Sequence, residues 1–92
     1  MVSLRTPKEL STELCQAIRT RRKQMQLSQA RLAEKSGVSL STLRKYEQTG
    51  QISLTSFIKL LFVLELADDL MTLFYSEPTP YTSMDDLLKT LP

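Results

Sequence analysis

The 92-residue chain is long enough for one small domain with a modest core, and its formal net charge at pH 7 is only +2. It has no histidine and one cysteine, Cys15, which excludes an internal disulfide and favours a reducing compartment such as the cytoplasm. The apolar run 57–66 contains Lys59 and Glu65, so it is too short and too charged to span a membrane.

The charges are distributed unevenly. Residues 1–59 hold 11 Lys and Arg against 4 Asp and Glu, whereas residues 60–92 hold 1 against 6. A basic amino-terminal part suits a polyanion such as DNA, which would repel the acidic part. Glycine is scarce, leucine is abundant and β-branched residues form no alternating runs, so an all-α fold is expected.

The first helix is predicted to begin at Thr6, which can act as N-cap, with Pro7 at the first helical position and Glu9 completing a capping box. It should end near residues 24–26. Cys15 is interpreted as buried filler rather than a reactive thiol. The apolar stripe of this helix is expected to comprise Leu10, Leu14, Ala17, Ile18 and Met25.

Three later helix starts share one device, a serine N-cap whose preceding apolar residue can pack on the apolar residue four positions after the serine. The serines are Ser28, Ser39 and Ser53, and they predict helices over residues 29–36, 40–48 and 54–64. Gly37 and Gly50 are expected at the left-handed ends of the first two. The helix over 54–64 is apolar nearly all round, so it lies in the core or covers the core on one side and a partner on the other.

A fifth helix is predicted over residues 68–75, which completes a domain over residues 1–75. Residues 76–92 are predicted to be a separate element, a linker containing Pro78 and Pro80 followed by a short helix. This last helix is too short to stand alone in water, so it must dock on the body, on a second subunit or on another protein. Its apolar side would carry Met84, Leu87, Leu88 and Leu91.

Residues 27–50 read as a helix, a glycine turn and a second helix with polar and basic residues on its free face, which is the helix-turn-helix pattern of major-groove binding. Arg44 is the best candidate for a bidentate contact to guanine, with Lys45 close behind. Leu40 and Thr42 suit thymine methyl groups, although the Thr42 methyl could instead pack between the two helices. The other expected DNA contacts are Ser41 and Gln29 in the groove and Ser28, Arg31, Gln51, Arg21 and Lys23 at phosphates.

Glu47 falls on the inward side of the second helix, four residues after Leu43, and its expected partner is Arg22. A partly buried pair of this kind would lock the first helix to the recognition helix. We interpret both residues as structural. The chain has no histidine, metal-ligand cluster, glycine-rich phosphate loop or nucleophile beside a base, so we expect neither an enzyme nor a cofactor.

The motif Leu27-Ser28-Gln29-x-x-Leu32-Ala33, then Gly37-Val38-Ser39-x-Ser41-Thr42-Leu43 and Glu47-x-x-Gly50, resembles the phage-repressor-like (Cro/C1, XRE) helix-turn-helix family over about residues 10–66. Arg22 stands where that family has its structural arginine. The resemblance implies a five-helix lambda-repressor-like domain, dimeric binding to an inverted repeat and repression of transcription. Its DNA contacts carry over to Gln29, Leu40, Ser41, Arg44 and Lys45.

Two positions depart from the family pattern. Leu40 replaces a commonly long polar residue, which favours a methyl contact over a hydrogen bond. Glu65 stands where a glycine often ends the fourth helix, which predicts a looser turn into the fifth. The segment from Leu66 onward resembles the HipB-like antitoxins that are encoded beside HipA-type kinase toxins.

The leading hypothesis is therefore a repressor of the bacterial cytoplasm and nucleoid that binds double-stranded DNA as a homodimer. A second is the antitoxin of a toxin–antitoxin module that autoregulates its operon. A prophage or stand-alone regulator without a toxin, and an interaction module that has lost DNA binding, remain alternatives. The dimer or partner contacts are expected from Phe62, Leu66, Leu70, Met71, Leu73 and Phe74.

Overall fold

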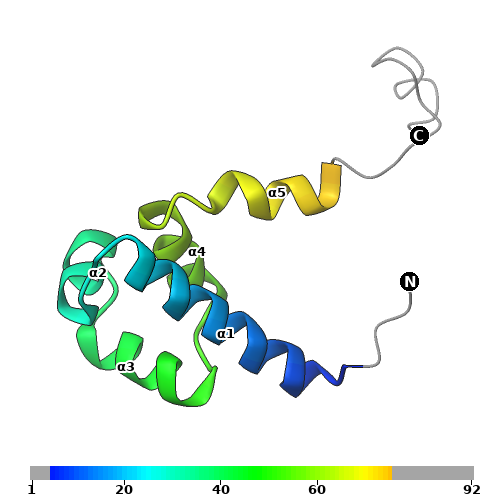
Figure 1. Cartoon of the computed structure of the whole chain (residues 1–92), viewed down its shortest axis with the longest axis horizontal. Helices are drawn as coiled ribbons and strands as arrows, with labels where there is room; N and C mark the ends of the chain where they lie inside the picture. The colour runs from blue at the N-terminus through cyan, green and yellow to red at the C-terminus, as the bar shows by residue number, and fades with distance from the viewer. Residues whose placement is uncertain (1–4, 76–92) are drawn as a thin grey trace, which may run out of the picture.

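The computed structural model describes residues 5–75, which fold into five α-helices joined by short turns (Figure 1). The all-α prediction is confirmed, and the predicted ends of the second to fifth helices agree with the observed ones to within one residue. The predicted linker and short helix over residues 76–92 lie outside the described residues. The helices are α1 (Pro7–Gln24), α2 (Gln29–Ser36), α3 (Leu40–Thr49), α4 (Leu54–Val63) and α5 (Ala67–Tyr75).

Each of the first four helices begins at the predicted N-cap. The hydroxyl groups of Ser28, Ser39 and Ser53 accept the backbone N–H three residues on, at 3.0, 3.1 and 3.2 Å. Thr6 accepts the Glu9 N–H at 3.1 Å, and its hydroxyl donates to the Glu9 carboxylate at 3.0 Å. Glu9 thus pairs with the Thr6 hydroxyl, whereas a standard capping box would use the Thr6 backbone N–H. Each cap stabilises its helix by about 1 kcal/mol.

The core lies where α2, α3 and α4 meet under α1. Its largest fully buried side chains are Leu32, Leu43, Leu60 and Leu64. Cys15 is buried, as expected, and its thiol donates to the Tyr46 carbonyl at 3.0 Å. The three serine caps orient their helices toward this core, because the apolar residue before each serine and its predicted partner four residues after it all belong to the core or pack against it.

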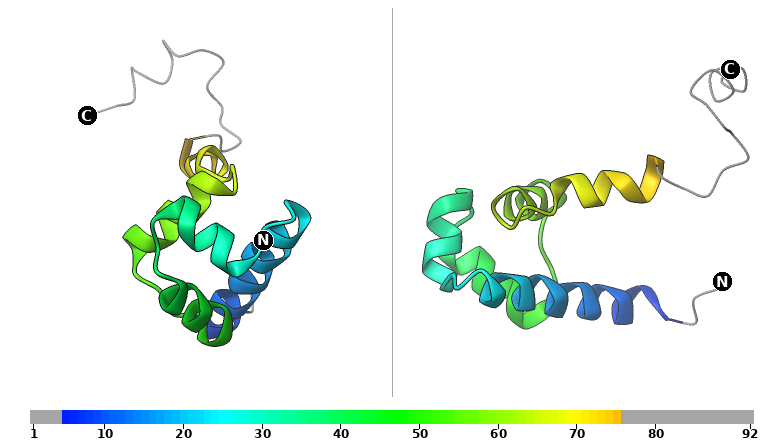
Figure 2. Two further views of the ribbon diagram at one scale, coloured as in Figure 1. Left: turned by 90° about the vertical axis from the view of Figure 1, so that its left-hand side faces the viewer. Right: turned by 45° about the horizontal axis from the view of Figure 1, so that its top comes forward.

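The predicted apolar stripe of α1 is only partly correct. Ile18 is buried and Met25 half-buried, but Leu10 and Leu14 are 55% and 44% exposed and Ala17 is exposed. The buried side of α1 is instead centred on Cys15, Ile18 and Arg22. The reason is that the first half of α1 extends beyond the helices that cover its second half, as Figures 1 and 2 show.

The turn from α4 to α5 is tighter than expected. Glu65 adopts the left-handed conformation at φ +59°, which glycine usually provides. The Glu65 N–H donates to the Phe62 carbonyl at 3.3 Å, and the Leu66 N–H donates to the Leu61 carbonyl at 2.9 Å. These two bonds form a Schellman motif. The prediction of a looser turn was therefore wrong, because the backbone bonds hold Glu65 in an unfavourable conformation.

Candidate nucleic-acid interface

The helix-turn-helix leaves one side of α3 free. Leu43 and Tyr46 face the core, and Gly37 and Gly50 end α2 and α3 in left-handed conformations at φ +77° and +76°, as predicted. The side chains of Ser41, Arg44, Lys45 and Gln48 are exposed on the other side. Figures 1 and 2 show α3 and α5 on opposite sides of the molecule, so the exposed face of α3 is remote from the carboxyl-terminal helix.

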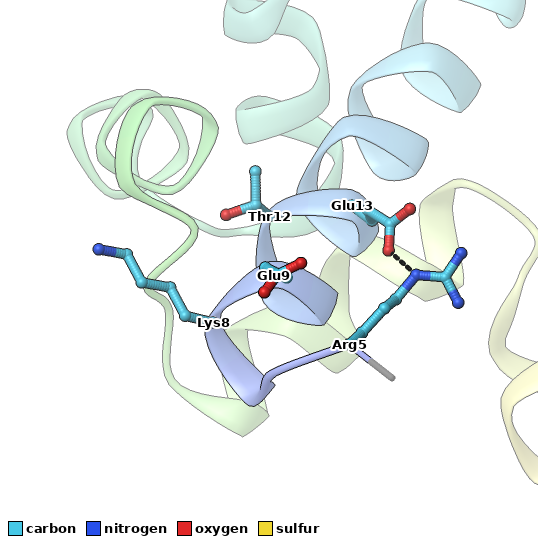
Figure 3. Close-up of a pocket in the computed structure, with 5 residues that line it drawn as sticks. All are labelled: Arg5, Lys8, Glu9, Thr12 and Glu13. Carbon is cyan, nitrogen blue, oxygen red and sulfur yellow. Dashed lines mark ion pairs between the residues drawn. The ribbon is translucent and has the colours of Figure 1, made fainter. Parts of the chain in front are cut away.

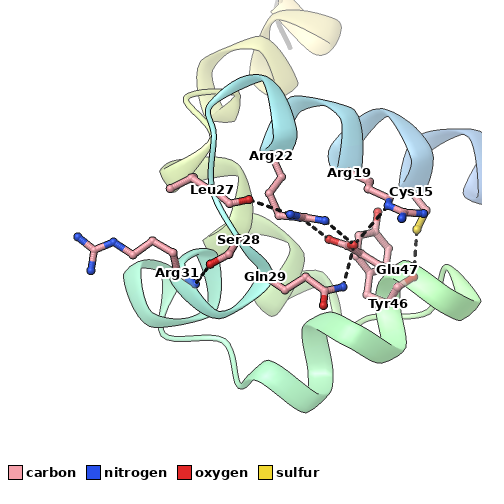
Figure 4. A network of polar contacts seen from close by, with 9 residues as sticks. All are labelled: Cys15, Arg19, Arg22, Leu27, Ser28, Gln29, Arg31, Tyr46 and Glu47. Atoms are coloured by element: carbon pink, nitrogen blue, oxygen red, sulfur yellow. Dashed lines mark hydrogen bonds and ion pairs between the residues drawn. The ribbon is translucent and has the colours of Figure 1, made fainter.

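The predicted ion pair between Arg22 and Glu47 is present and is the centre of a larger network (Figure 4). Arg22 Nε donates to Glu47 Oε2 at 2.8 Å, and Arg22 Nη2 donates to Glu47 Oε1 at 3.0 Å. Arg22 Nη1 donates to the Leu27 carbonyl at 2.8 Å. One guanidinium group therefore joins α1, the turn before α2 and the inward side of α3, which fixes α3 relative to the rest of the fold.

Gln29 belongs to this network, which sequence reasoning did not predict. Its side-chain Nε2 donates to Glu47 Oε1 at 3.0 Å. Arg19 lies at the edge, with Nε 3.8 Å from the same oxygen and about half of its side chain exposed. Its position three residues before Arg22, one turn earlier on α1, was the signal available in the sequence.

The surroundings of Glu47 shift its acid–base equilibrium. Burial on its own would raise the pKa of the Glu47 carboxyl group. The hydrogen bonds from Arg22 and Gln29 and the positive charges of Arg22 and Arg19 outweigh burial, so the pKa lies below its ordinary value. The Glu47 side chain is therefore an ionised carboxylate at neutral pH, which fits a structural role in the ion pair rather than a role in proton transfer.

The groove residues predicted at the start of α3 differ in how freely they reach solvent. Ser41 is exposed, whereas Leu40 is half-buried and packs against the core. Thr42 is also half-buried, and its hydroxyl accepts a hydrogen bond from Ser39 at 2.7 Å. Thr42 and Leu40 therefore each have only part of their side chain available to a ligand.

Among the expected phosphate contacts, Gln51 is exposed and Ser28 uses its hydroxyl as an N-cap. Arg31 is exposed and forms an ion pair with Glu34 on its own helix. Arg21 does not fit a phosphate contact, because its Nε donates to the Leu64 carbonyl at 3.0 Å and its Nη2 lies 3.8 Å from Glu65. It instead fastens α1 to the turn between α4 and α5.

A hollow at the start of α1 shows no arrangement suited to chemistry (Figure 3). It is lined by Arg5, Lys8, Glu9, Thr12 and Glu13, and an ion pair joins Arg5 to Glu13. Residues 5–75 contain no group of three metal-ligating side chains. No helix in this part of the chain is long and apolar enough to cross a membrane.

Comparison with known proteins identifies the fold but no near relative. A family model described as helix-turn-helix matches residues 18–67, the segment that runs from the second half of α1 to the start of α5. No curated protein and no solved structure matches the chain.

Proposed function

Because the family match covers more than half of the chain, the protein belongs to the Cro/C1-type (XRE) helix-turn-helix family of DNA-binding transcription regulators, and we propose that it is a repressor that binds an inverted-repeat operator as a homodimer. It would act in the bacterial cytoplasm, on the nucleoid. The observation that carries the proposal is the exposed basic side of α3 backed by the buried Arg22–Glu47 pair. A rigidly held helix with free donors is what major-groove reading requires.

In this proposal Arg44 and Lys45 read base edges, because both are exposed and each side chain carries several donors. Ser41 contacts a base edge or a phosphate. Leu40 and Thr42 contribute methyl surface only where their packing leaves it free. Ser28, Arg31 and Gln51 face phosphates, and Gln29, whose side chain Glu47 holds in place, faces the groove.

The test is binding to operator fragments selected from genomic DNA. Replacing Arg44 and Lys45 together by Ala should lower operator affinity at least ~30-fold, since each base contact contributes about 1–3 kcal/mol. The matched control is the double change Lys35→Ala and Lys59→Ala, which removes the same charge from exposed positions on α2 and α4. The proposal fails if both double variants lose affinity equally, or if the parent protein binds no fragment better than random DNA.

The proposed homodimer would bring together the outer sides of α4 and α5. Phe62 is 70% exposed, and Met71, Leu73 and Phe74 are also exposed. Leu66 and Leu70 pack partly on the core and have less surface to offer. Paired recognition helices would then lie roughly 34–36 Å apart, one turn of DNA.

A second candidate function is that of an antitoxin, for which the observation is the acidic segment 76–92 with its apolar Met84, Leu87, Leu88 and Leu91. These residues lie outside the described part of the chain. In this proposal the segment binds a HipA-like kinase toxin while the complex represses its own operon. Coexpression with the neighbouring gene and affinity purification tests it: a kinase-like protein should copurify with the intact chain, and a chain that always elutes alone would contradict it.

A further inference from the structure

One side of α1 is apolar and uncovered, and it points toward α5. Arg21, Ala17, Leu14 and Leu10 follow one another at helical spacing along this side. Because Arg21 donates to the Leu64 carbonyl in the turn between α4 and α5, the whole side is directed toward that end of the molecule. Along this side Arg21 is half-buried, Ala17 is exposed, and Leu10 and Leu14 are 55% and 44% exposed.

The end of α5 is bare in the same way. Leu66 and Leu70 pack against the core, and Leu73 and Phe74 follow Leu70 by three and four residues, so they continue the same side of the helix. Both are 67% exposed. α5 has only nine residues and contains no fully buried side chain. A helix of this length is marginal in water unless its apolar side is covered.

The two bare regions lie at the same end of the molecule. α1 and α5 run antiparallel, and the first turns of α1 lie on the same side of the molecule as the last turn of α5 (Figures 1 and 2). We call Leu10, Leu14, Met71, Leu73 and Phe74 together the α1–α5 face. Five large apolar side chains exposed at one end of the molecule indicate that something covers them.

We propose that residues 83–91 of the same chain cover the α1–α5 face. The chain leaves α5 at Tyr75, beside this face, so the segment starts where it is needed. Residues 76–83 can span about 25 Å, which exceeds the roughly 13 Å length of α5 and allows the chain to return along it. Pro78 and Pro80 prevent α5 from continuing straight on.

The composition of the segment matches the face. Met84, Leu87, Leu88 and Leu91 repeat at i, i+3, i+4 and i+7, which gives one apolar stripe about as long as the last turns of α5. Asp85 and Asp86 fall outside that stripe and would remain in water. The segment thus offers one narrow apolar side to an apolar face that has no partner in the described part of the chain.

This inference goes beyond the proposed function, and it restricts the residues that are available for the proposed dimer contact. If residues 83–91 occupy the end of α5, a second copy is left with the outer stripe of α4, formed by Leu54, Ile58 and Phe62 at four-residue spacing. Leu54 is 71% exposed. A toxin that bound residues 83–91 would have to displace them from the face, which would couple toxin binding to the stability of α5.

The test measures the reactivity of a cysteine placed in the face. In the full chain, Leu73→Cys is alkylated with a maleimide, and peptide mapping separates its product from that of the buried Cys15. The rate is compared in the same protein with Leu87→Asp and Leu88→Asp. We expect the intact segment to slow alkylation at least tenfold. The matched reporter is Leu54→Cys, whose parent residue is similarly exposed but lies on α4; its rate should not depend on the segment.

Each other outcome overturns the proposal. Equal, fast alkylation of Leu73→Cys in both backgrounds would leave the face open, and equal, slow alkylation would mean that a second copy covers it. Mixing the reporter chain with a tenfold excess of reporter-free Leu87→Asp, Leu88→Asp chains should leave protection intact; its loss would assign the covering segment to the partner. If the double variant unfolds, which fast reaction of Cys15 would reveal, Leu88→Ser replaces it under the same criteria.

Discussion

Glu47 has 4% of its side chain exposed and accepts hydrogen bonds from two helices. Replacing it by Ala leaves the Arg22 guanidinium buried without its counter-charge, which costs about 3–5 kcal/mol of unfolding free energy. Urea unfolding at pH 7 measures the loss. The control is Glu34→Ala, because Glu34 forms an ion pair with Arg31 at the surface and its removal should cost less than about 1 kcal/mol. Equal losses would show that the buried network contributes no more than a surface pair.

The same residue gives stability a defined pH dependence. The folded pKa of Glu47 is lower than the unfolded one, about 4.3, so the unfolded chain binds its proton first as the solution is acidified. The contribution of Glu47 is therefore complete above the unfolded pKa and is lost as pH falls through the folded pKa. Urea titrations from pH 7 to pH 3 should show stability falling below about pH 5. Glu47→Gln should make stability depend less on pH in this range. An unchanged pH profile would mean that other carboxylates cause the loss of stability.

Only part of this network could be predicted from the sequence. The spacing of Glu47 from Leu43 placed it on the inward side of α3, and a buried carboxylate needs a cation, which identified Arg22. Gln29 was expected only at DNA, because nothing in the sequence links the first residue of a helix to a partner 18 residues away. The contact of Arg21 was missed for a related reason: its acceptor is the Leu64 carbonyl, and a backbone carbonyl has no signature in the sequence.

At the scale of helices and turns, the start or end of a helix could be predicted from the sequence where a single side chain determines it. The serine caps determine where α2, α3 and α4 begin, and Gly37 and Gly50 determine where α2 and α3 end. Each of these signals lies within a few residues of the boundary that it determines. Gln26 and Glu65 also adopt left-handed conformations, at φ +58° and +59°, without being glycine. Their turns depend on backbone hydrogen bonds and on packing of the flanking leucines, and neither is visible in residue type.

Glu65 therefore offers a stabilising substitution. The left-handed conformation costs a residue with a Cβ about 1–2 kcal/mol, and glycine avoids this cost while losing more backbone entropy on folding. Glu65→Gly should raise the unfolding free energy by about 0.5–1 kcal/mol, since the exposed contact of Glu65 with Arg21 contributes little. Thermal unfolding followed by circular dichroism measures the change as a higher Tm.

The opposite substitution supplies the control. Gly50 has φ +76°, and a Cβ there would lie 3.4 Å from Ser11 Oγ. Gly50→Ala should lower the Tm, because the new side chain adopts an unfavourable conformation beside a close neighbour. A decrease in Tm for Glu65→Gly would mean that the carboxylate contributes more than the backbone conformation costs.

For the molecule as a whole, periodicity predicted that α1 and α4 are amphipathic or apolar but not what covers each side. Leu10 and Ile18 look equivalent in the sequence, yet only Ile18 is buried, because coverage depends on where the other helices end in space. The apolar circumference of α4 left two alternatives, and the exposure of Phe62 excludes the one in which α4 lies wholly within the core of one chain.

Phe62 allows the proposed dimer to be tested without disturbing the fold. Because it is largely exposed in one protomer, Phe62→Asp should leave the Tm of a monomer nearly unchanged while placing two like charges at the two-fold contact. Light scattering should then give a monomer mass. Affinity for a full inverted repeat should fall at least ~10-fold, because the second half-site no longer binds with the first, whereas affinity for an isolated half-site should be unaffected.

The control is Thr55→Asp, since Thr55 is also exposed on α4. This substitution adds the same charge outside the stripe of Leu54, Ile58 and Phe62 and should leave the dimer intact. A Phe62→Asp protein that remains dimeric and binds the full operator normally would exclude this side of α4 from the two-fold contact.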